Sequence, residues 1–276
     1  MRKHGSVEVV ALITVAIFFA AGAVWYYETH SAPAPITQIT SGSNTAVPQS
    51  QGCTLLPYTG TSSLSQLPYY VAGDPDFRGG MVCHFIINSK LPTFTFHFKG
   101  EPDNTMGLIT ITEGTGTQVI QTIDPSSIKD PNGSGWDGFD PNAIAPETYQ
   151  DILVPVDANF DGYEDLPLLV ECGATGNCSY DFYIYDPATN QFVYNDFLSG
   201  LGTFSIDSST QEIDATWAGG SYCDGGMDTY KYYNATYTLI QETDSNCDDV
   251  STTVSTYELR NGKMQLINAT TTPTGT

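Results

Sequence analysis

The chain has 276 residues, nine of them basic and 31 acidic, so its formal net charge is −22. This balance argues against nucleic acid as a partner, because phosphate binding needs a basic surface. A solvated acidic surface and a basic protein partner remain as alternatives. The 17 Tyr and 13 Phe, with abundant Thr and Gly, favour strands and turns over helices.

The N-terminal part of the chain predicts export. Residues 1–8 form a short basic cytoplasmic region, and residues 9–27 are an almost unbroken apolar run. A run of about 20 apolar residues can span a bilayer, which favours an uncleaved transmembrane helix as membrane anchor. Cleavage of a signal peptide near an Ala-Gly-Ala sequence, which would give a secreted protein, is the alternative. Residues 28–52 are rich in Ser, Thr and Pro and predict a linker.

Residues 53–276 predict an extracytoplasmic all-β domain. Short β-rich segments recur with turn signals about every eight to twelve residues, which is typical of barrels, sandwiches and propellers. Asn261-Gly262 is a strong signal for a type I′ hairpin turn. The expected strands are Met81–Ile87, Thr93–Phe98, Gly107–Thr112, Thr117–Ile123, Ser179–Asp186, Gln191–Tyr194, Gly202–Ile206, Glu212–Trp217, Thr229–Gln241, Thr252–Leu259 and Lys263–Asn268.

All six cysteines lie beyond the linker. An even number of cysteines in an exported chain favours disulfides over free thiols. A zinc site is less favoured, because no pair of cysteines has the short spacing of zinc ligands. Proximity in the sequence suggests the pairs Cys53–Cys83, Cys172–Cys178 and Cys223–Cys247.

A long acidic loop from Asp124 to Tyr149 separates the first strands from the rest. It carries Trp136 and Phe139 near its centre. Long loops in compact domains often have a function, and exposed aromatic residues beside acidic ones suit a contact with a partner. The alternative is that both rings only pack the loop onto the core.

The nine residues 157–165, Asp-Ala-Asn-Phe-Asp-Gly-Tyr-Glu-Asp, predict a calcium site. Side-chain oxygens of Asp157, Asn159, Asp161 and Asp165 fall at positions 1, 3, 5 and 9 of the loop, and Tyr163 would offer its backbone carbonyl at position 7. Calcium prefers about six to eight oxygen ligands, and a glycine at position 6 allows the sharp reversal. A turn rich in Asn, Asp and Gly without metal is the alternative.

The flanks of this loop exclude an EF-hand. That motif requires a helix on each side and a bidentate glutamate at position 12, which is Leu168 here. Residues 152–156 and 166–170 are short apolar runs interrupted by proline, which predict buried strands.

No catalytic motif is recognisable. The chain has no Gly-x-Ser-x-Gly sequence, no His-Glu-x-x-His sequence and no phosphate-binding loop. A pair of carboxylates of the glycosidase kind is compatible with the many acidic residues, although no pair stands out. We therefore expect a protein that is not an enzyme.

Residues 154–201 resemble a family of bacterial exported β-proteins. The motifs are D-x-N-x-D-G-Y-x-D-L at 157–166, a cysteine-containing turn at 176–179 and the Tyr-rich hairpin Y-x-Y-D-P-x-T-x-x-F at 183–192. The hairpin at 257–266 also looks like the last hairpin of this FG-GAP-like or VCBS-like family. In its calcium loop the family is similar to the repeats of integrin propellers. It includes periplasmic immunity proteins that inhibit peptidoglycan-cleaving effectors delivered by type IV secretion.

The resemblance implies an irregular β-propeller-like fold, with a β-sandwich as the alternative, and a structural calcium ion held by the five residues named above. We expect a membrane-anchored binding or inhibitor module for a protein or a cell-envelope partner. A cell-wall or glycan hydrolase and a purely structural surface domain are the alternatives.

Overall fold

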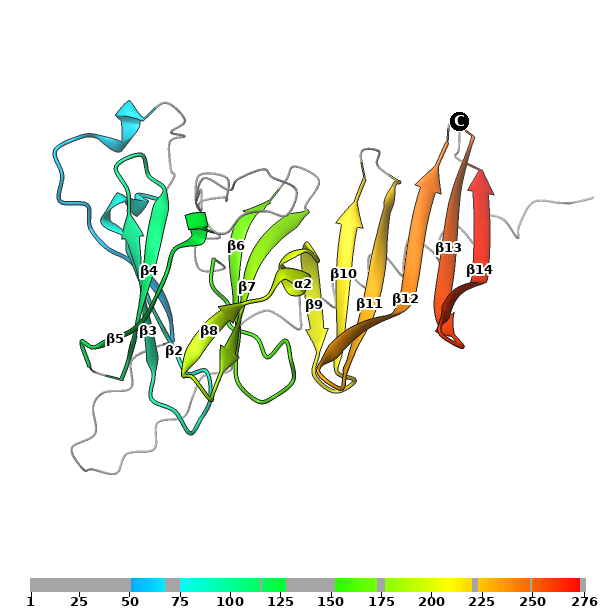
Figure 1. Cartoon of the computed structure of the whole chain (residues 1–276). Helices are drawn as coiled ribbons and strands as arrows, with labels where there is room; N and C mark the ends of the chain where they lie inside the picture. Colours follow the sequence, from blue (N-terminus) through cyan, green and yellow to red (C-terminus); the bar gives the residue numbers. More distant parts are fainter. Residues whose placement is uncertain are drawn as a thin grey trace, which may run out of the picture. The chain divides into compact units, whose positions relative to one another are not determined.

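The computed structural model describes residues 51–67, 75–114, 116–127, 152–172, 177–219, 223–248 and 250–273. All of them belong to one compact unit, Gln49–Thr276. Its regular structure is almost entirely β (Figure 1), so the all-β expectation is confirmed. Within the described ranges, every helix is too short or too polar to cross a membrane. The expected anchor at 9–27 lies outside these ranges.

Three antiparallel sheets make up the described unit, and in each sheet the strands follow one another in chain order. The first sheet has five strands, which are β1 (Gly52–Leu55), β2 (Met81–Phe85), β3 (Phe94–Gly100), β4 (Met106–Glu113) and β5 (Val119–Ile123). The second has three strands, which are β6 (Leu166–Cys172), β7 (Cys178–Asp186) and β8 (Gln191–Tyr194).

The third sheet has six strands, which are β9 (Thr203–Asp207), β10 (Glu212–Ala218), β11 (Gly225–Tyr233), β12 (Thr236–Cys247), β13 (Ser251–Arg260) and β14 (Lys263–Pro273). The short helix α2 (Asp196–Ser199) follows β8, and 3-10 turns occur at Leu64–Gln66, Phe77–Gly79 and Pro125–Ser127. Blades of a regular propeller have about four strands each. These sheets have five, three and six, so the propeller stays a prediction.

The main hydrophobic core lies between the first and second sheets. In β3, Phe94, Phe96 and Phe98 are buried, as their alternation predicts. The ring of Phe94 makes edge contacts with Tyr185 and Phe192, at 5.8 and 5.9 Å between centroids. Aromatic contacts of this kind add to the burial of apolar area, so β3 holds the two sheets together.

Two side-chain amides continue the hydrogen bonding from one sheet to the next. Gln121 donates to the carbonyl of Phe192 and accepts from its N–H, both at 2.7 Å. Asn177 makes the same pair of bonds with Ala218, also at 2.7 Å. Each side-chain amide thus takes the place of a peptide group of a neighbouring strand. It pairs with the N–H and C=O of an edge strand that would otherwise be unpaired.

Three disulfides staple the unit, and they join the cysteines that proximity in the sequence suggested. The pairs are Cys53–Cys83, Cys172–Cys178 and Cys223–Cys247. The first joins β1 to β2, and the second joins β6 to β7 at directly paired positions. Disulfides that persist are typical of exported proteins, which places the described unit outside the cytoplasm.

Two expected strands differ from the structure. Residues 229–241 form parts of two strands, because Asn234 and Ala235 both have positive φ, 51° and 57°, and make a two-residue hairpin turn. Residues 152–156 make only isolated bridges, from Leu153 to Leu168 and from Val156 to Asp165. Pro155 has no N–H, so this segment cannot complete a regular ladder. The turn at Asn261 and Gly262 has φ of 54° and 74°, which confirms the expected hairpin.

Candidate functional site

The loop 157–165 is closed at its base by backbone hydrogen bonds. Val156 and Asp165 exchange N–H···O bonds of 3.1 and 2.6 Å. The chain reverses through Phe160 and Gly162, whose φ angles are 57° and 87°. No atom of the described residues lies within 4 Å of where a Cβ on Gly162 would be, so the glycine is required there by its backbone conformation and not by crowding.

Carboxylates inside the loop order its backbone. Asp157 accepts the N–H of Asp161 at 3.0 Å on one oxygen and that of Gly162 at 2.9 Å on the other. Asp161 accepts the N–H of Tyr163 at 2.9 Å. Asn159 accepts from the Asp161 N–H at 3.1 Å and donates its amide to the Asp161 carboxylate at 3.0 Å. The oxygens at positions 1, 3 and 5 are therefore held in one small network.

Asp165 is the buried acid of the loop, with no exposed surface. Its two oxygens accept the N–H groups of Ala158 at 3.0 Å and Tyr185 at 2.9 Å. Burial, with smaller contributions from the charges of Asp161 and Asp157, outweighs the two hydrogen bonds and raises the pKa of Asp165 to about 7. A cation among these carboxylates would favour their charged forms, because an opposite charge offsets both burial and repulsion.

The loop touches all three sheets. Asn88, after β2, donates to the carbonyl of Gly162 at 2.7 Å, and Tyr185 of β7 donates to Asp165. The hydroxyl of Tyr237 in β12 donates to the carbonyl of Ala158 at 3.3 Å. The loop is thus a joint between segments about 70 to 80 residues apart in the chain. No local pattern in the sequence identifies Asn88, Tyr185 or Tyr237 as its partners.

The donor set fits a hard cation in its chemistry. A carboxylate has about four lone-pair sites, so one N–H bond on each oxygen of Asp157 leaves capacity for a metal. In the described ranges, the group of three metal-type side chains that lie within 4.8 Å of one another is Cys223, Asp224 and Cys247. Its two cysteines form a disulfide and offer no thiolate. The carboxylates of the loop are less closely gathered than this group. A cation in the loop would therefore also need the side-chain oxygen of Asn159 and the carbonyl of Tyr163 as ligands.

A second notable feature is an acidic face on the six-stranded sheet. Asp228 of β11 lies directly opposite Glu242 of β12, and Asp244 follows on the same face. Like charges placed opposite each other destabilise a sheet. Burial, and then the charges of Asp244 and Asp228, raise the pKa of Glu242. None of the ion pairs recorded for the described residues includes these acids.

An exposed tryptophan flanks this acidic face. Trp217 is 43% exposed and pairs with Gly226, which in turn pairs with Asp244. The indole lies over Gly226, where any side chain would collide with it. From here on, the term acidic face means the three acids Asp228, Glu242 and Asp244 together with the adjacent Trp217. Its first and last members, Trp217 and Asp244, are 27 positions apart in the sequence, and the pairing of three strands brings them together. The contact residues expected in the acidic loop, Trp136 and Phe139, lie outside the described ranges.

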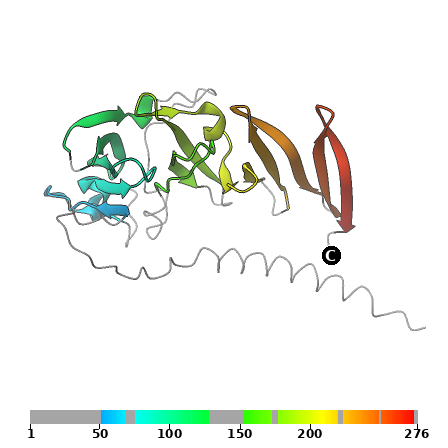
Figure 2. The same cartoon turned by 90° about the horizontal axis from the view of Figure 1, so that it is seen from below.

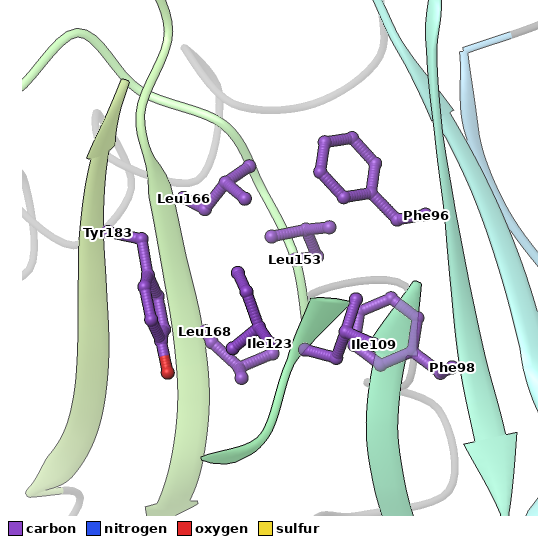
Figure 3. Close-up of a pocket in the computed structure, with 8 residues that line it drawn as sticks. All are labelled: Phe96, Phe98, Ile109, Ile123, Leu153, Leu166, Leu168 and Tyr183. Carbon is purple, nitrogen blue, oxygen red and sulfur yellow. The ribbon is translucent and has the colours of Figure 1, made fainter. Parts of the chain in front are cut away.

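A third feature is a buried polar pair in the core. Asp181 and Tyr183 are 8% and 5% exposed, and among the residues that the structure describes, Asp181 Oδ2 and the Tyr183 hydroxyl have no hydrogen-bond partner. Tyr183 also lines a cavity of about 10 Å³ (Figure 3), whose other lining residues are Phe96, Phe98, Ile109, Ile123, Leu153, Leu166 and Leu168. A cavity of about this size holds at most one water molecule, so it is not a substrate pocket.

We expect the Asp181→Asn variant to be more stable than the wild type at neutral pH. Burial raises the pKa of Asp181 from 3.8 to about 6. The contribution of Asp181 to stability is therefore fully present when the pH is below 3.8, the pKa in the unfolded state, and is lost as the pH rises through 6. The substitution should therefore add about 2–3 kcal/mol to the free energy of unfolding at pH 7.5 and little at pH 4. Denaturant unfolding at both pH values measures this.

Asp207→Asn is the matched control for that variant. Its carboxylate accepts from the hydroxyl and N–H of Ser209, and the hydroxyl lowers its pKa. This substitution should destabilise the protein at pH 7.5. Equal stability of wild type and Asp181→Asn at pH 7.5 would contradict the prediction.

Comparison with protein families and with curated proteins gives no match for this chain. Among solved structures, the chain is similar to one described as a Xanthomonas type IV secretion system related protein. The two share 21% identity over 69% of this chain and 94% of the other, with a TM-score of 0.46. A likeness this loose assigns neither a fold family nor a function.

Proposed function

We propose that this protein is a binding module that acts outside the cytoplasm on a basic protein partner. The observation that carries the proposal is the acidic face, where three carboxylates lie together and no basic residue of the described ranges pairs with them. Opposed like charges cost stability, so their presence suits a surface that gains energy when a cation-rich partner covers it. The exposed Trp217 beside them is a residue type that often dominates binding energy.

The charge of the chain supports the same kind of partner. Four of the basic residues, Arg78, Lys99, Lys231 and Arg260, are already held in ion pairs with neighbouring acids. The net charge of −22 therefore creates a negative field that steers basic proteins toward the surface and speeds their association.

The inhibitory role rests on the sequence resemblance. The motifs at 157–166 and 183–192 resemble exported proteins that include immunity proteins against peptidoglycan-cleaving effectors. In this proposal the apolar segment 9–27 would hold the module at the membrane, the sheets would form an irregular propeller, and the partner would be such an effector enzyme. The module itself would not be an enzyme.

Calcium would serve this module as a structural ion. The ligands would be the side chains of Asp157, Asn159, Asp161 and Asp165 and the carbonyl of Tyr163, and the ion would neutralise carboxylates that otherwise repel one another. The hydrogen bonds of the loop to β7, β12 and Asn88 mean that ordering the loop also orders the segments around it.

The test measures binding and inhibition of a basic peptidoglycan hydrolase by the full chain in mild detergent. The double variant Glu242→Gln with Asp244→Asn should weaken binding at least about tenfold at low salt, and less at high salt, because salt screens the lost charges. Glu101→Gln with Glu258→Gln removes the same charge elsewhere and should bind nearly as wild type. Unchanged binding by the first double variant would contradict the proposal.

A further inference from the structure

We propose that strand β14 is a docking edge, on which an extended basic segment of a partner protein adds a further antiparallel strand to the six-stranded sheet. The inference rests on the proposed function and deepens it, because it names the mode of recognition. Addition of a strand to an exposed sheet edge uses main-chain hydrogen bonds for affinity and alternate side chains for specificity.

The position and exposure of β14 leave its outer side open to the extent that the described residues show. It is the last strand of its sheet and pairs on one side with β13 (Figure 1; Figure 2). Ten of its 11 residues are exposed. Leu266 and Ile267 are 56% and 42% exposed. About half of the backbone N–H and C=O groups of such a strand point away from its neighbour and can pair with another chain.

The rest of the described unit gives β14 little cover. Among the described elements, only β13 makes more than marginal contact with it. The threonines at positions 271 and 272 make hydrogen bonds back to β13, to Thr253 at 3.0 Å and to the carbonyl of Thr252 at 3.4 Å. These bonds fix the strand against β13 without using its outer edge.

The sequence of β14 lacks the usual protection of an edge strand. Natural edges are blunted by Lys, Pro, charges or bulges along their length. Here Lys263 and Pro273 stand at the two ends, and the residues between them carry no charge in a chain that has 31 acidic residues. A register shift occurs at Thr256/Tyr257, and beyond it Asn268–Pro273 pair regularly with β13. An uncharged, regular stretch of five residues, 268–272, therefore remains open within the described part of the chain.

Charge identifies the occupant as a basic segment. Two copies of this chain would each bring a net charge of −22, so repulsion opposes their approach. Asp248 lies beyond the Ser251–Pro273 end of the hairpin, and hydrogen bonds from the N–H groups of Val250 and Ser251 hold its carboxylate in the charged form by lowering its pKa. The charge of β14 itself is that of Lys263, so a strand with Lys or Arg at alternate positions would be attracted by the net charge of the chain and by Asp248 while its main chain pairs with β14.

The probe for this edge is a fluorescent peptide of alternating lysine and valine, added to the full chain. Its control has the same sequence with every second amide N-methylated, which keeps the charge but removes one hydrogen-bonding edge. We expect the methylated peptide to bind about tenfold more weakly or worse by fluorescence anisotropy, because several main-chain hydrogen bonds are lost. Equal affinities would overturn the proposal, since charge alone would then explain binding.

Ala269→Pro and Thr270→Pro form a matched pair of variants. Adjacent residues of a strand point their N–H groups in opposite directions, so one proline removes an outward N–H and the other an N–H bonded to β13. The outward variant should keep wild-type thermal stability and bind the peptide at least about tenfold more weakly. Wild-type binding by the variant that keeps its stability would overturn the proposal. A dimer of the chain alone that this variant disrupts would also overturn it, in favour of a second copy.

Failure of this inference is distinguishable from failure of the proposed function. If the outward proline variant binds and inhibits the hydrolase normally while Glu242→Gln with Asp244→Asn does not, the acidic face binds the partner and β14 does not. If neither set of variants changes binding of the hydrolase, the proposed function fails as well.

Discussion

Calcium should raise the melting temperature of the wild-type protein, and a chelator should lower it. A ligand that binds only the folded state stabilises it by about 2.7 kcal/mol when it is present at a hundred times its dissociation constant. For a domain of this size that energy corresponds to a shift of about 5–10 °C. Thermal unfolding in calcium and in chelator, followed by circular dichroism, measures the difference.

The Asp161→Ala variant should lose this response. Asp161 is the central carboxylate of the loop and also holds the N–H of Tyr163, so the variant removes a metal ligand together with a loop contact. Asp207→Ala is the matched control, because Asp207 orders a turn through Ser209 in the same way but lies in the β9–β10 hairpin. A wild-type melting temperature that ignores both calcium and chelator would exclude the calcium site.

Replacement of Asp165 by alanine should destabilise the protein even when no calcium is present. The variant leaves the buried N–H groups of Ala158 and Tyr185 without acceptors, and each costs about 1–3 kcal/mol. We expect a loss of about 3–5 kcal/mol in the free energy of unfolding, a large part of the stability of a typical domain. Denaturant unfolding in chelator measures this loss apart from any metal effect.

The control for Asp165 is Asp186→Ala. Asp186 also accepts a backbone N–H, from Ala188 at 2.9 Å, and a hydroxyl, from Thr189 at 2.8 Å, but it lies in an exposed turn. Water can replace the lost acceptor there, so the loss of stability should be much smaller. Similar losses for the two variants would mean that the buried position of Asp165 has no special role.

Much of the fold was predictable because its signals are local. The alternation of Phe94, Phe96 and Phe98 gave the buried face of β3, and Asn261-Gly262 gave the last turn. The turn at Asn234 and Ala235 was not predictable in the same way. Alanine seldom adopts positive φ, and the pairing of β11 with β12 on both sides of the turn holds it there.

The candidate site was predictable only in part. The spacing of Asp157, Asn159 and Asp161 identified a loop of oxygen donors, and the structure shows these side chains in one network. The burial of Asp165 was not predictable, because it depends on Tyr185, a residue 20 positions further along the chain. The acidic face arises in the same way, from the register of strands that the sequence does not specify alone.

By itself, the sequence determined the all-β class and the nine-residue loop, because turns and alternation act between near neighbours. Proximity in the sequence only suggested the disulfide pairs, and the structure shows them. The tertiary structure decided which sheets the loop joins, which acids lie together and which strand is left at an open edge. Those features depend on the pairing of segments far apart in the chain. Several pairings are compatible with the same local sequence pattern, and side-chain packing and strand register decide between them.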